Sequence, residues 1–230
     1  DTLTHEMTFI TAPKNNLRNI NQIFINCDIE IERLISQNFA LGVELFNEHE
    51  LQSGVVLINL GSKKISLGVF KNLALIHSIT FPIGIDHITN DISKVCSLNL
   101  EESFAIRNNT DFLFKNNQNL FDENNLLKKI FFIDSKFRKI SKDLIFKIIR
   151  ARIDEILEMI KKQLKLTGFN FNSGTNFFLI GEGSNFINIQ EYFQNFFELN
   201  TLIGKKNDSE KNFSACQGGI RIINEGWETE

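Results

Sequence analysis

An apolar run bounded by two glycines is the feature of this sequence that most constrains its fold. Residues 54–61 read Gly-Val-Val-Leu-Ile-Asn-Leu-Gly, and a second apolar run at 65–70 follows after a short Ser-Lys-Lys turn. A third run, 73–81, begins after only two more residues. β-branched and aromatic residues favour strands, and gaps this short join antiparallel neighbours. The segment therefore predicts a three-stranded antiparallel meander.

A single long helix is predicted between Ser141 and Gly168. Ser141 is a suitable N-cap, and Gly168 is a suitable C-terminal stop. Between them, aliphatic residues recur every three or four positions: Ile145, Ile149, Ile153, Ile156, Ile160 and Leu164. This spacing predicts one buried stripe on a helix of about 25 residues, which is roughly 38 Å long.

The other expected elements are shorter and alternate between strand and helix. Strands are expected at 7–11, 29–35 and 176–180. Helices are expected at 17–24, 40–46, 87–95, 100–108 and 187–197. A polar loop is expected at 47–53, and the Asn-rich stretch 110–125 is expected to be an exposed loop. Strands separated by helices are typical of the α/β class.

Composition narrows the classes of function. The 230 residues are 42% hydrophobic and 23% charged, which is typical of a globular protein. A net charge of -3 gives no general attraction to nucleic acid or anionic lipid, and no apolar run approaches the ~18 residues of a membrane span. Three isolated cysteines and four histidines without i, i+4 spacing predict neither a disulfide framework nor a zinc site.

Four segments, in order, resemble motifs of one family. Residues 53–70 resemble the second phosphate-binding hairpin of the actin-like ATPase superfamily, usually V-D-x-G-x-G-T-T. Residues 84–92 are similar to the G-x-x-x-I-T-x-D-I segment of the bacterial cell-division protein FtsA. Residues 148–157 and 179–184 resemble the I-I-R-x-R-x-E-E-I-L helix and the L-T-G-G-G-S adenosine loop of that family. The resemblance covers about residues 7–223.

The resemblance implies an actin-like (ribonuclease H-like) ATPase fold, in which a mixed α/β sheet is flanked by helices and joined to a smaller α+β subdomain. Residues 1–52 would be the remainder of the first lobe. Residues 53–96 and 175–226 would form the core of the second lobe, and 97–174 its small subdomain with a long partner-binding helix. The family binds nucleotide between two lobes, and its first phosphate hairpin has no counterpart here. This chain would therefore supply half of a cleft.

The resemblance also implies nucleotide-binding positions in the hairpin, where several residue types differ from the family pattern. Asn59 stands in place of the aspartate that holds the waters of a nucleotide-bound Mg²⁺, and it contributes no negative charge. After Gly61, the residues Ser62, Lys63 and Lys64 replace small residues that let backbone N–H groups approach phosphate. Either lysine would meet phosphate only as a point charge.

The adenosine loop differs in the same way. Gly181 and Gly183 remain, but Glu182 places an anion where the backbone would lie against the nucleotide. Phe104 replaces the family's glutamate beside the ribose, whereas Arg107 keeps the positive charge of the usual lysine. These changes together predict weak or lost nucleotide binding and no efficient hydrolysis. ATP and Mg²⁺ are expected cofactors only of a longer, full-length protein.

The long helix carries the positions that the resemblance assigns to a protein partner. In FtsA this subdomain grips the C-terminal tail of FtsZ, the tubulin-like ring protein. Arg150 and Arg152 match the family's arginines, and a guanidinium suits bidentate capture of a carboxylate. Glu155 follows on the charged face and completes the candidate set.

Three functions are compatible with these features. The first is an FtsA-like adaptor that links the FtsZ ring to the division site, at the cytoplasmic face of the inner membrane, with membrane attachment through segments outside this sequence. The second is a working actin-like ATPase in which Lys63 and Lys64 compensate for Asn59. The third is a pilus-assembly type of actin-like scaffold. Self-association into filaments is compatible with each of them but is not indicated by any short motif, and nucleic acid is not an expected partner.

Overall fold

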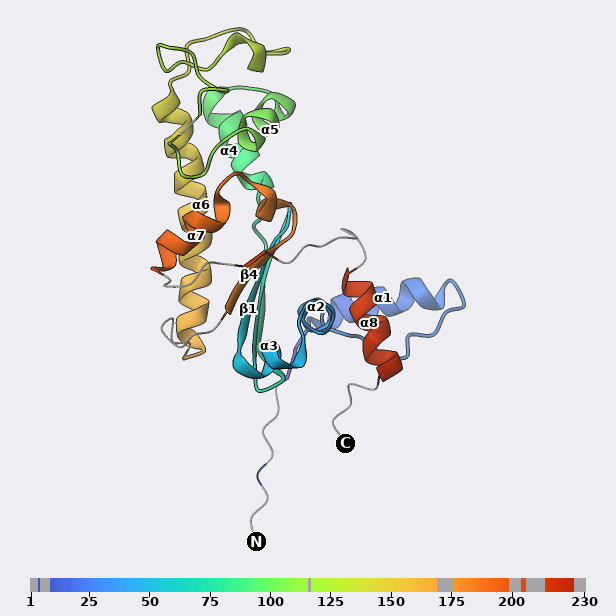
Figure 1. Cartoon of the computed structure of the whole chain (residues 1–230). Coiled ribbons are helices and arrows are strands. Elements are labelled where there is room, and N and C mark those ends of the chain that lie inside the picture. Colours follow the sequence, from blue (N-terminus) through green and yellow to red (C-terminus); the bar gives the residue numbers. More distant parts are fainter. Residues whose placement is uncertain are drawn as a thin grey trace.

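The computed structural model describes residues 4, 9–115, 117–168, 176–198, 204–205 and 214–225 (Figure 1). The strands are β1 (Val55–Leu60), β2 (Ile65–Lys71), β3 (Ala74–Phe81), β4 (Asn176–Ile180) and β5 (Gly204–Lys205). The α-helices are α1 (Lys14–Ile25), α2 (Gln37–Leu45), α3 (Glu48–Ser53), α4 (Asp86–Cys96), α5 (Leu100–Asn108), α6 (Lys142–Leu166), α7 (Ile189–Phe197) and α8 (Ser214–Glu225). Short 3₁₀ turns are η1 (Lys129–Phe131) and η2 (Glu182–Asn185).

The strands form one mixed sheet in the order β3-β2-β1-β4-β5. β1 to β3 are antiparallel neighbours, which confirms the predicted meander, and β4 and β5 continue the sheet in parallel with β1. The register sets Asn59 beside Ser66 on one side and beside Ile180 on the other. The first and fourth strands therefore end at the same edge of the sheet.

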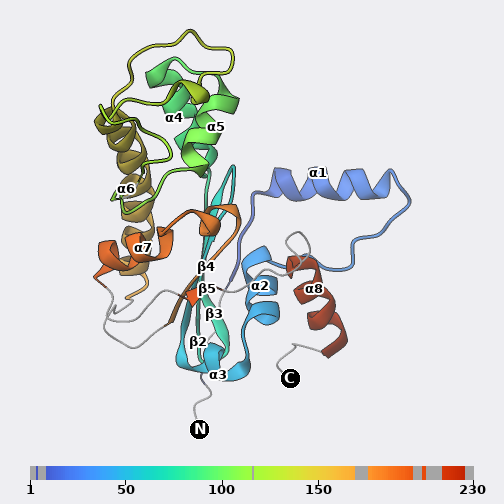
Figure 2. The same cartoon turned by 45° about the horizontal axis from the view of Figure 1, so that its top comes forward.

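Both faces of the sheet are covered, which explains why β1 is a continuous apolar run. Val56, Ile58 and Leu60 point toward the core that α4, α6 and α7 complete, whereas Val55 and Leu57 point toward the cluster formed with α2 and α3. Figures 1 and 2 show α6 and α7 on one side of the sheet and α2 on the other. α8 packs against α2.

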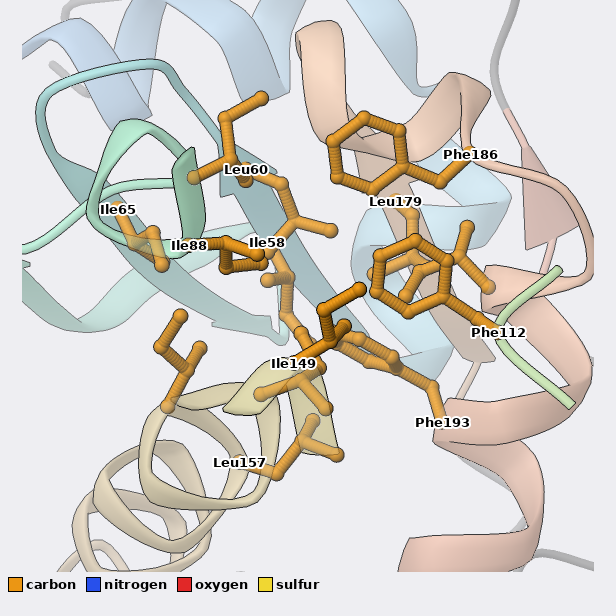
Figure 3. Close-up of a cluster of buried hydrophobic side chains, with 14 of the residues drawn as sticks. Ile58, Leu60, Ile65, Ile88, Phe112, Ile149, Leu157, Leu179, Phe186 and Phe193 are labelled. Carbon is orange, nitrogen blue, oxygen red and sulfur yellow. The ribbon is translucent and has the colours of Figure 1, made fainter. Parts of the chain in front are cut away.

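The larger core lies between the sheet and α6 (Figure 3). The predicted stripe on α6 is buried throughout, and Leu157 joins it. Ser141 accepts a hydrogen bond from the Leu144 amide, as its N-cap position predicts. Gly168 follows the end of the helix with a positive φ of 69°. The long helix is confirmed in its bounds, its buried face and its ends.

Two sequence expectations near the N-terminus are wrong. Residues 29–35 form no strand in the structure, because their alternating pattern has no neighbouring strand to pair with in the described chain. The predicted loop 47–53 contains α3, which begins with a capping box: the Asn47 side chain accepts from the Glu50 amide, and the Glu50 carboxylate accepts from the Asn47 amide. The expected strand 7–11 lies partly outside the described residues, and residues 9–11 are irregular.

The Asn-rich stretch is irregular, as expected, but it is not simply exposed. Phe112, Leu120 and Phe121 are buried in the core next to α6, and Phe112 stacks on Phe186 with ring centroids 4.9 Å apart. Buried aromatic residues between the asparagines fix this segment to the molecule. The domain boundaries expected at 52, 96 and 174 stay predictions.

Helix α1 differs from the other long helices. It lies outside the packed layers, on the α2 side of the sheet (Figures 1 and 2), and none of its residues is buried. Ile23 is 62% exposed, and Ile20, Phe24 and Ile25 are also exposed. The helix at 17–24 is confirmed, but its apolar face has no cover within the described residues.

Candidate functional site

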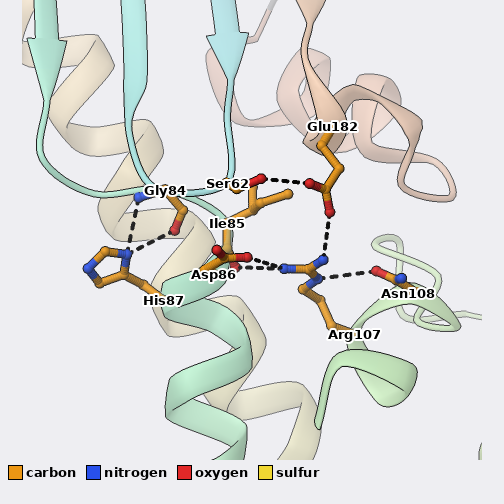
Figure 4. Close-up of polar contacts among 8 residues, drawn as sticks. All are labelled: Ser62, Gly84, Ile85, Asp86, His87, Arg107, Asn108 and Glu182. Carbon is orange, nitrogen blue, oxygen red and sulfur yellow. Dashed lines mark hydrogen bonds and ion pairs between the residues drawn. The ribbon is translucent and has the colours of Figure 1, made fainter. Parts of the chain in front are cut away.

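Four segments meet at the edge of the sheet where β1 and β4 end (Figure 4). These are the β1–β2 turn, the start of α4, the end of α5 and the loop after β4. Because β1 and β4 are parallel neighbours, the segments that follow them leave the sheet side by side. The structure thereby brings together candidate residues from 59–64, 107 and 181–183 of the sequence.

The β1–β2 turn is held by the start of α4. The Ile85 amide donates to the Gly61 carbonyl at 3.1 Å, and the Asp86 amide donates to the Ser62 carbonyl at 2.9 Å. A Cβ on Gly84 would lie 2.3 Å from the Ser62 oxygen, so a larger residue cannot take its place without moving the turn. Lys63 and Lys64 are exposed at the tip of this turn.

The glycines of the loop after β4 serve the same kind of close packing. Gly181 has a φ of 83°, and a Cβ there would lie 2.4 Å from Oδ1 of Asn59. A Cβ on Gly183 would lie 2.8 Å from side-chain atoms of Leu60 and Ile85. Both glycines are therefore required by contacts within the chain, and Asn59 lies directly against the loop.

Arg107 is the centre of the polar cluster. Its side chain is fully buried, and one amino group donates to the Ile85 carbonyl at 3.3 Å and to the Asp86 carboxylate at 3.2 Å. The second amino group donates to Oε1 of Glu182 at 2.9 Å. The guanidinium also lies over two rings, 4.6 Å from the centroid of Phe104 and 5.2 Å from that of Phe186. A buried cation with this many partners is strongly fixed.

Glu182 closes the cluster across the sheet edge. Its Oε2 accepts a hydrogen bond from the Ser62 hydroxyl at 2.6 Å, while Oε1 receives Arg107. Its side chain is 47% exposed, so this carboxylate forms the outer surface of the cluster. One glutamate thus bridges the β1–β2 turn and α5.

The structure places the three partner-binding candidates on α6 but does not bring the two arginines together. Arg152 pairs with Asp91 of α4 at 2.6 Å and with Glu155, also on α6, at 2.5 Å. The hydrogen bond and the charge of Asp91 raise the pKa of Arg152 above its ordinary value, against the opposing effect of burial. Arg150 is exposed and lies over the Phe114 ring, 4.7 Å from its centroid. Residues two apart on a helix face different directions.

Sequence reasoning missed a carboxylate that organises the neighbouring loop. Glu102 of α5 is buried, and it accepts hydrogen bonds from the amides of Ile133, Asp134 and Ser135 and from the Ser135 hydroxyl. Burial alone would raise the pKa of Glu102, but the bonds from Ser135, Asn99 and Asp134 lower it to about 2. The signal was present, since Asn99-Leu-Glu-Glu102 is a capping-box pattern.

Two further classes of feature, a metal-binding cluster and a membrane-spanning helix, are not found in the part of the chain that the structure describes. Among the residues that the structure describes, no three His, Cys, Asp or Glu side chains are grouped so that they could hold a metal ion. Within the same residues, no helix combines the length and the apolar character that crossing a membrane requires.

Comparison with known proteins identifies the family. The family model for "Cell division protein FtsA" matches residues 56–218. The chain belongs to the FtsA family. FtsA of Agrobacterium fabrum is 24% identical over 209 residues, which are 89% of this chain and 46% of that protein. FtsA of Neisseria meningitidis is 26% identical over 207 residues, again 89% of this chain and 48% of the relative. The chain thus spans about half the length of these FtsA relatives.

Solved structures confirm the fold of this FtsA chain. MreB5 of Spiroplasma citri bound to AMPPNP superposes with a TM-score of 0.66 at 15% identity, covering 94% of this chain and 66% of MreB5. The MamK filament gives a TM-score of 0.62 at 12% identity, with 92% of this chain and 65% of that chain covered. The fold is actin-like, with a mixed sheet between helices, as the resemblance implied.

Proposed function

We propose that this chain is the partner-binding part of an FtsA-type adaptor, which links the FtsZ ring to the division site at the cytoplasmic face of the inner membrane. Membership of the FtsA family supports a role in cell division. The match of the family model extends across the whole of α6, the helix that carries the candidate arginines.

The observation that carries the proposal is the different state of the two arginines on α6. Arg152 is largely engaged by Asp91 and Glu155, so its main role would be to fix α6 against α4. Arg150 is exposed, and its stacking on Phe114 together with its hydrogen bond to the Tyr192 hydroxyl holds the guanidinium at the surface. A fixed, exposed guanidinium is well suited to a carboxylate of an acidic peptide. We infer that Arg150 meets the FtsZ tail and that Arg152 positions the helix.

The test is binding of a fluorescent FtsZ C-terminal tail peptide to the full chain, followed by anisotropy. Arg150→Ala is expected to weaken binding at least tenfold, because a charge-assisted bidentate contact contributes about 1.5–3 kcal/mol. Lys162→Ala, an exposed cation on the same helix, is the matched control and is expected to change binding less than twofold. Arg152→Glu is expected both to weaken peptide binding and to lower the melting temperature, because Arg152 fixes α6 through Asp91 and Glu155.

A folded sample that binds no tail peptide would contradict the adaptor proposal. Equal losses for Arg150→Ala and Lys162→Ala would contradict the assignment of Arg150, because they would indicate general charge attraction. Self-association is proposed as a second property of the same protein, supported by the likeness of its fold to a filament subunit. Sedimentation velocity over a range of protein concentrations tests it.

A further inference from the structure

The actin-like fold implies a nucleotide with Mg²⁺ at the edge where β1 and β4 end. A nucleotide site needs donors and cations that are turned toward the ligand. Here the Ser62 hydroxyl and the Arg107 guanidinium both donate to Glu182. The space beside Gly84, Gly181 and Gly183, where these residues have no side chain, is occupied by other atoms of the same chain. The residues do not fit an anionic nucleotide.

We propose that Glu182 is a built-in substitute for the anionic ligand, and that it locks this edge in a nucleotide-independent form. Its carboxylate accepts hydrogen bonds from the Ser62 hydroxyl of the turn and from the buried Arg107 guanidinium. These are two donors that a phosphate group would otherwise use. We call this set of three residues the Glu182 latch. It connects positions 120 residues apart in the sequence.

The carboxylates around the turn also disfavour binding of a nucleotide. Lys63 and Lys64 are exposed at the tip of the turn, but a phosphate chain placed beside Ser62 would meet the Glu182 carboxylate and, next to it, the Asp86 carboxylate, which shares the same arginine. Like charges in direct contact repel strongly when water is partly excluded from between them. Releasing Glu182 would leave the fully buried guanidinium of Arg107 with one carboxylate partner in place of two. Removing a partner from a buried charge is more costly than breaking an exposed pair.

The surroundings of the cation make the latch a fixed element. The Arg107 guanidinium lies over the Phe104 ring and over the Phe186 ring, which belongs to the segment after β4. By the resemblance, Phe104 stands where the family would carry a glutamate beside the ribose, and in this chain it contacts the Arg107 cation instead. The latch therefore sets the position of α5 relative to the sheet without a ligand.

Thermal unfolding of the full chain tests the latch. Glu182→Ala is expected to lower the melting temperature by about 2–4 °C, the shift that corresponds to a loss of about 1 kcal/mol in a chain of this size. Glu158→Ala, an exposed glutamate on α6, is the control and is expected to change the melting temperature by less than 1 °C. Ser62→Ala is expected to lower the melting temperature of the Glu182→Ala variant by less than half as much as it lowers that of the unmodified chain, because the two residues share one hydrogen bond.

The same measurement with about 5 mM Mg·ATP or Mg·ADP tests whether the chain binds nucleotide, because a ligand that binds the native state raises the melting temperature. The unmodified chain is expected to shift by less than 1 °C. A rise of 2 °C or more, or a loss in Glu182→Ala no larger than in Glu158→Ala, would overturn the proposal. This outcome is independent of peptide binding, so failure of the latch and failure of the adaptor proposal are distinguishable.

Discussion

The two faces of the sheet are built from similar sequence patterns but are used very differently. On one face, α6 buries seven aliphatic residues in the larger core. On the other, α2 and α3 form a smaller cluster, α8 packs on α2, and α1 buries no residue although its apolar positions are also spaced for a helix. An amphipathic pattern therefore predicts a helix, whereas burial of its apolar face depends on a second surface elsewhere in the chain.

The largest difference between the faces is expected from two isoleucine substitutions. Ile153→Ala on α6 is expected to cost about 3–4 kcal/mol, because it removes a side chain that is only 1% exposed and leaves a cavity. Ile23→Ala on α1 is expected to change stability by less than about 0.5 kcal/mol, because that side chain is mostly exposed. Urea denaturation of both variants measures the difference, and equal losses would contradict it.

The second prediction concerns the contact of α8 with α2. A Cβ on Gly218 would lie 1.9 Å from the Ala40 carbonyl oxygen, whereas a Cβ on Gly219 would meet nothing within 4 Å. Gly218→Ala is therefore expected to cost about 2–3 kcal/mol through overpacking. Gly219→Ala is expected to stabilise α8 by up to about 1 kcal/mol, because alanine is the better helix former. Melting temperatures check the pair, and destabilisation by both would indicate a different packing of α8.

The third prediction concerns Glu102 of α5, which holds residues 133–135. Glu102→Gln is expected to cost about 2 kcal/mol, because the neutral amide is a weaker acceptor for the three backbone amides and also adds donors of its own. Glu101→Gln, the exposed neighbour on α5, is the control and is expected to be nearly neutral.

The pH dependence of Glu102 has a defined sign. The pKa of Glu102 is about 2 in the folded chain, below its ordinary value of 4.5, so its stabilisation is present in full above about pH 4.5 and is lost as the pH falls toward 2. The difference between the unmodified chain and Glu102→Gln should therefore be smaller at pH 3 than at pH 7. Denaturation at the two pH values measures this, and an unchanged difference would argue against an ionised Glu102.

The smallest expected effects come from one arginine on each face. Arg152 joins α6 to Asp91 of α4, and Arg221 joins α8 to the Val43 carbonyl of α2 at 3.0 Å. Arg152→Gln and Arg221→Gln are each expected to cost about 1 kcal/mol. Each arginine also pairs with a carboxylate, Arg152 with Asp91 and Arg221 with Glu225 at 3.2 Å, so high salt should reduce both losses. A loss that high salt leaves unchanged in either variant would argue against its ion pair.

Sequence patterns were sufficient where the physical cause is local. The three apolar runs of the meander and the stripe on α6 specify their own elements, and both were predicted. Residues 29–35 have the alternation of a strand without the partner that a strand requires. Helix α3 was missed because its capping box, Asn47 with Glu50, lies in a segment that is polar throughout.

The candidate site was predictable only in part. The resemblance selected the turn, the glycine loop and Arg107, and the structure brings these together. No local pattern could pair Glu182 with Arg107, which lies 75 residues away, or with Ser62. Likewise, the spacing of Arg150 and Arg152 suggested one binding face, but Asp91 of another helix determines the orientation of Arg152.

The parallel pairing of β1 with β4 has a consequence for the order in which the chain is made. Val55 lies beside Asn176, so β1 is complete long before its parallel neighbour leaves the ribosome. At roughly 5–20 residues per second, the delay is about ten seconds. During this time β1 is an apolar edge strand with unpaired backbone groups, the kind of edge that associates with other chains. A nascent chain halted before Asn176 is therefore expected to aggregate, and folding in the cell would depend on protection of that edge.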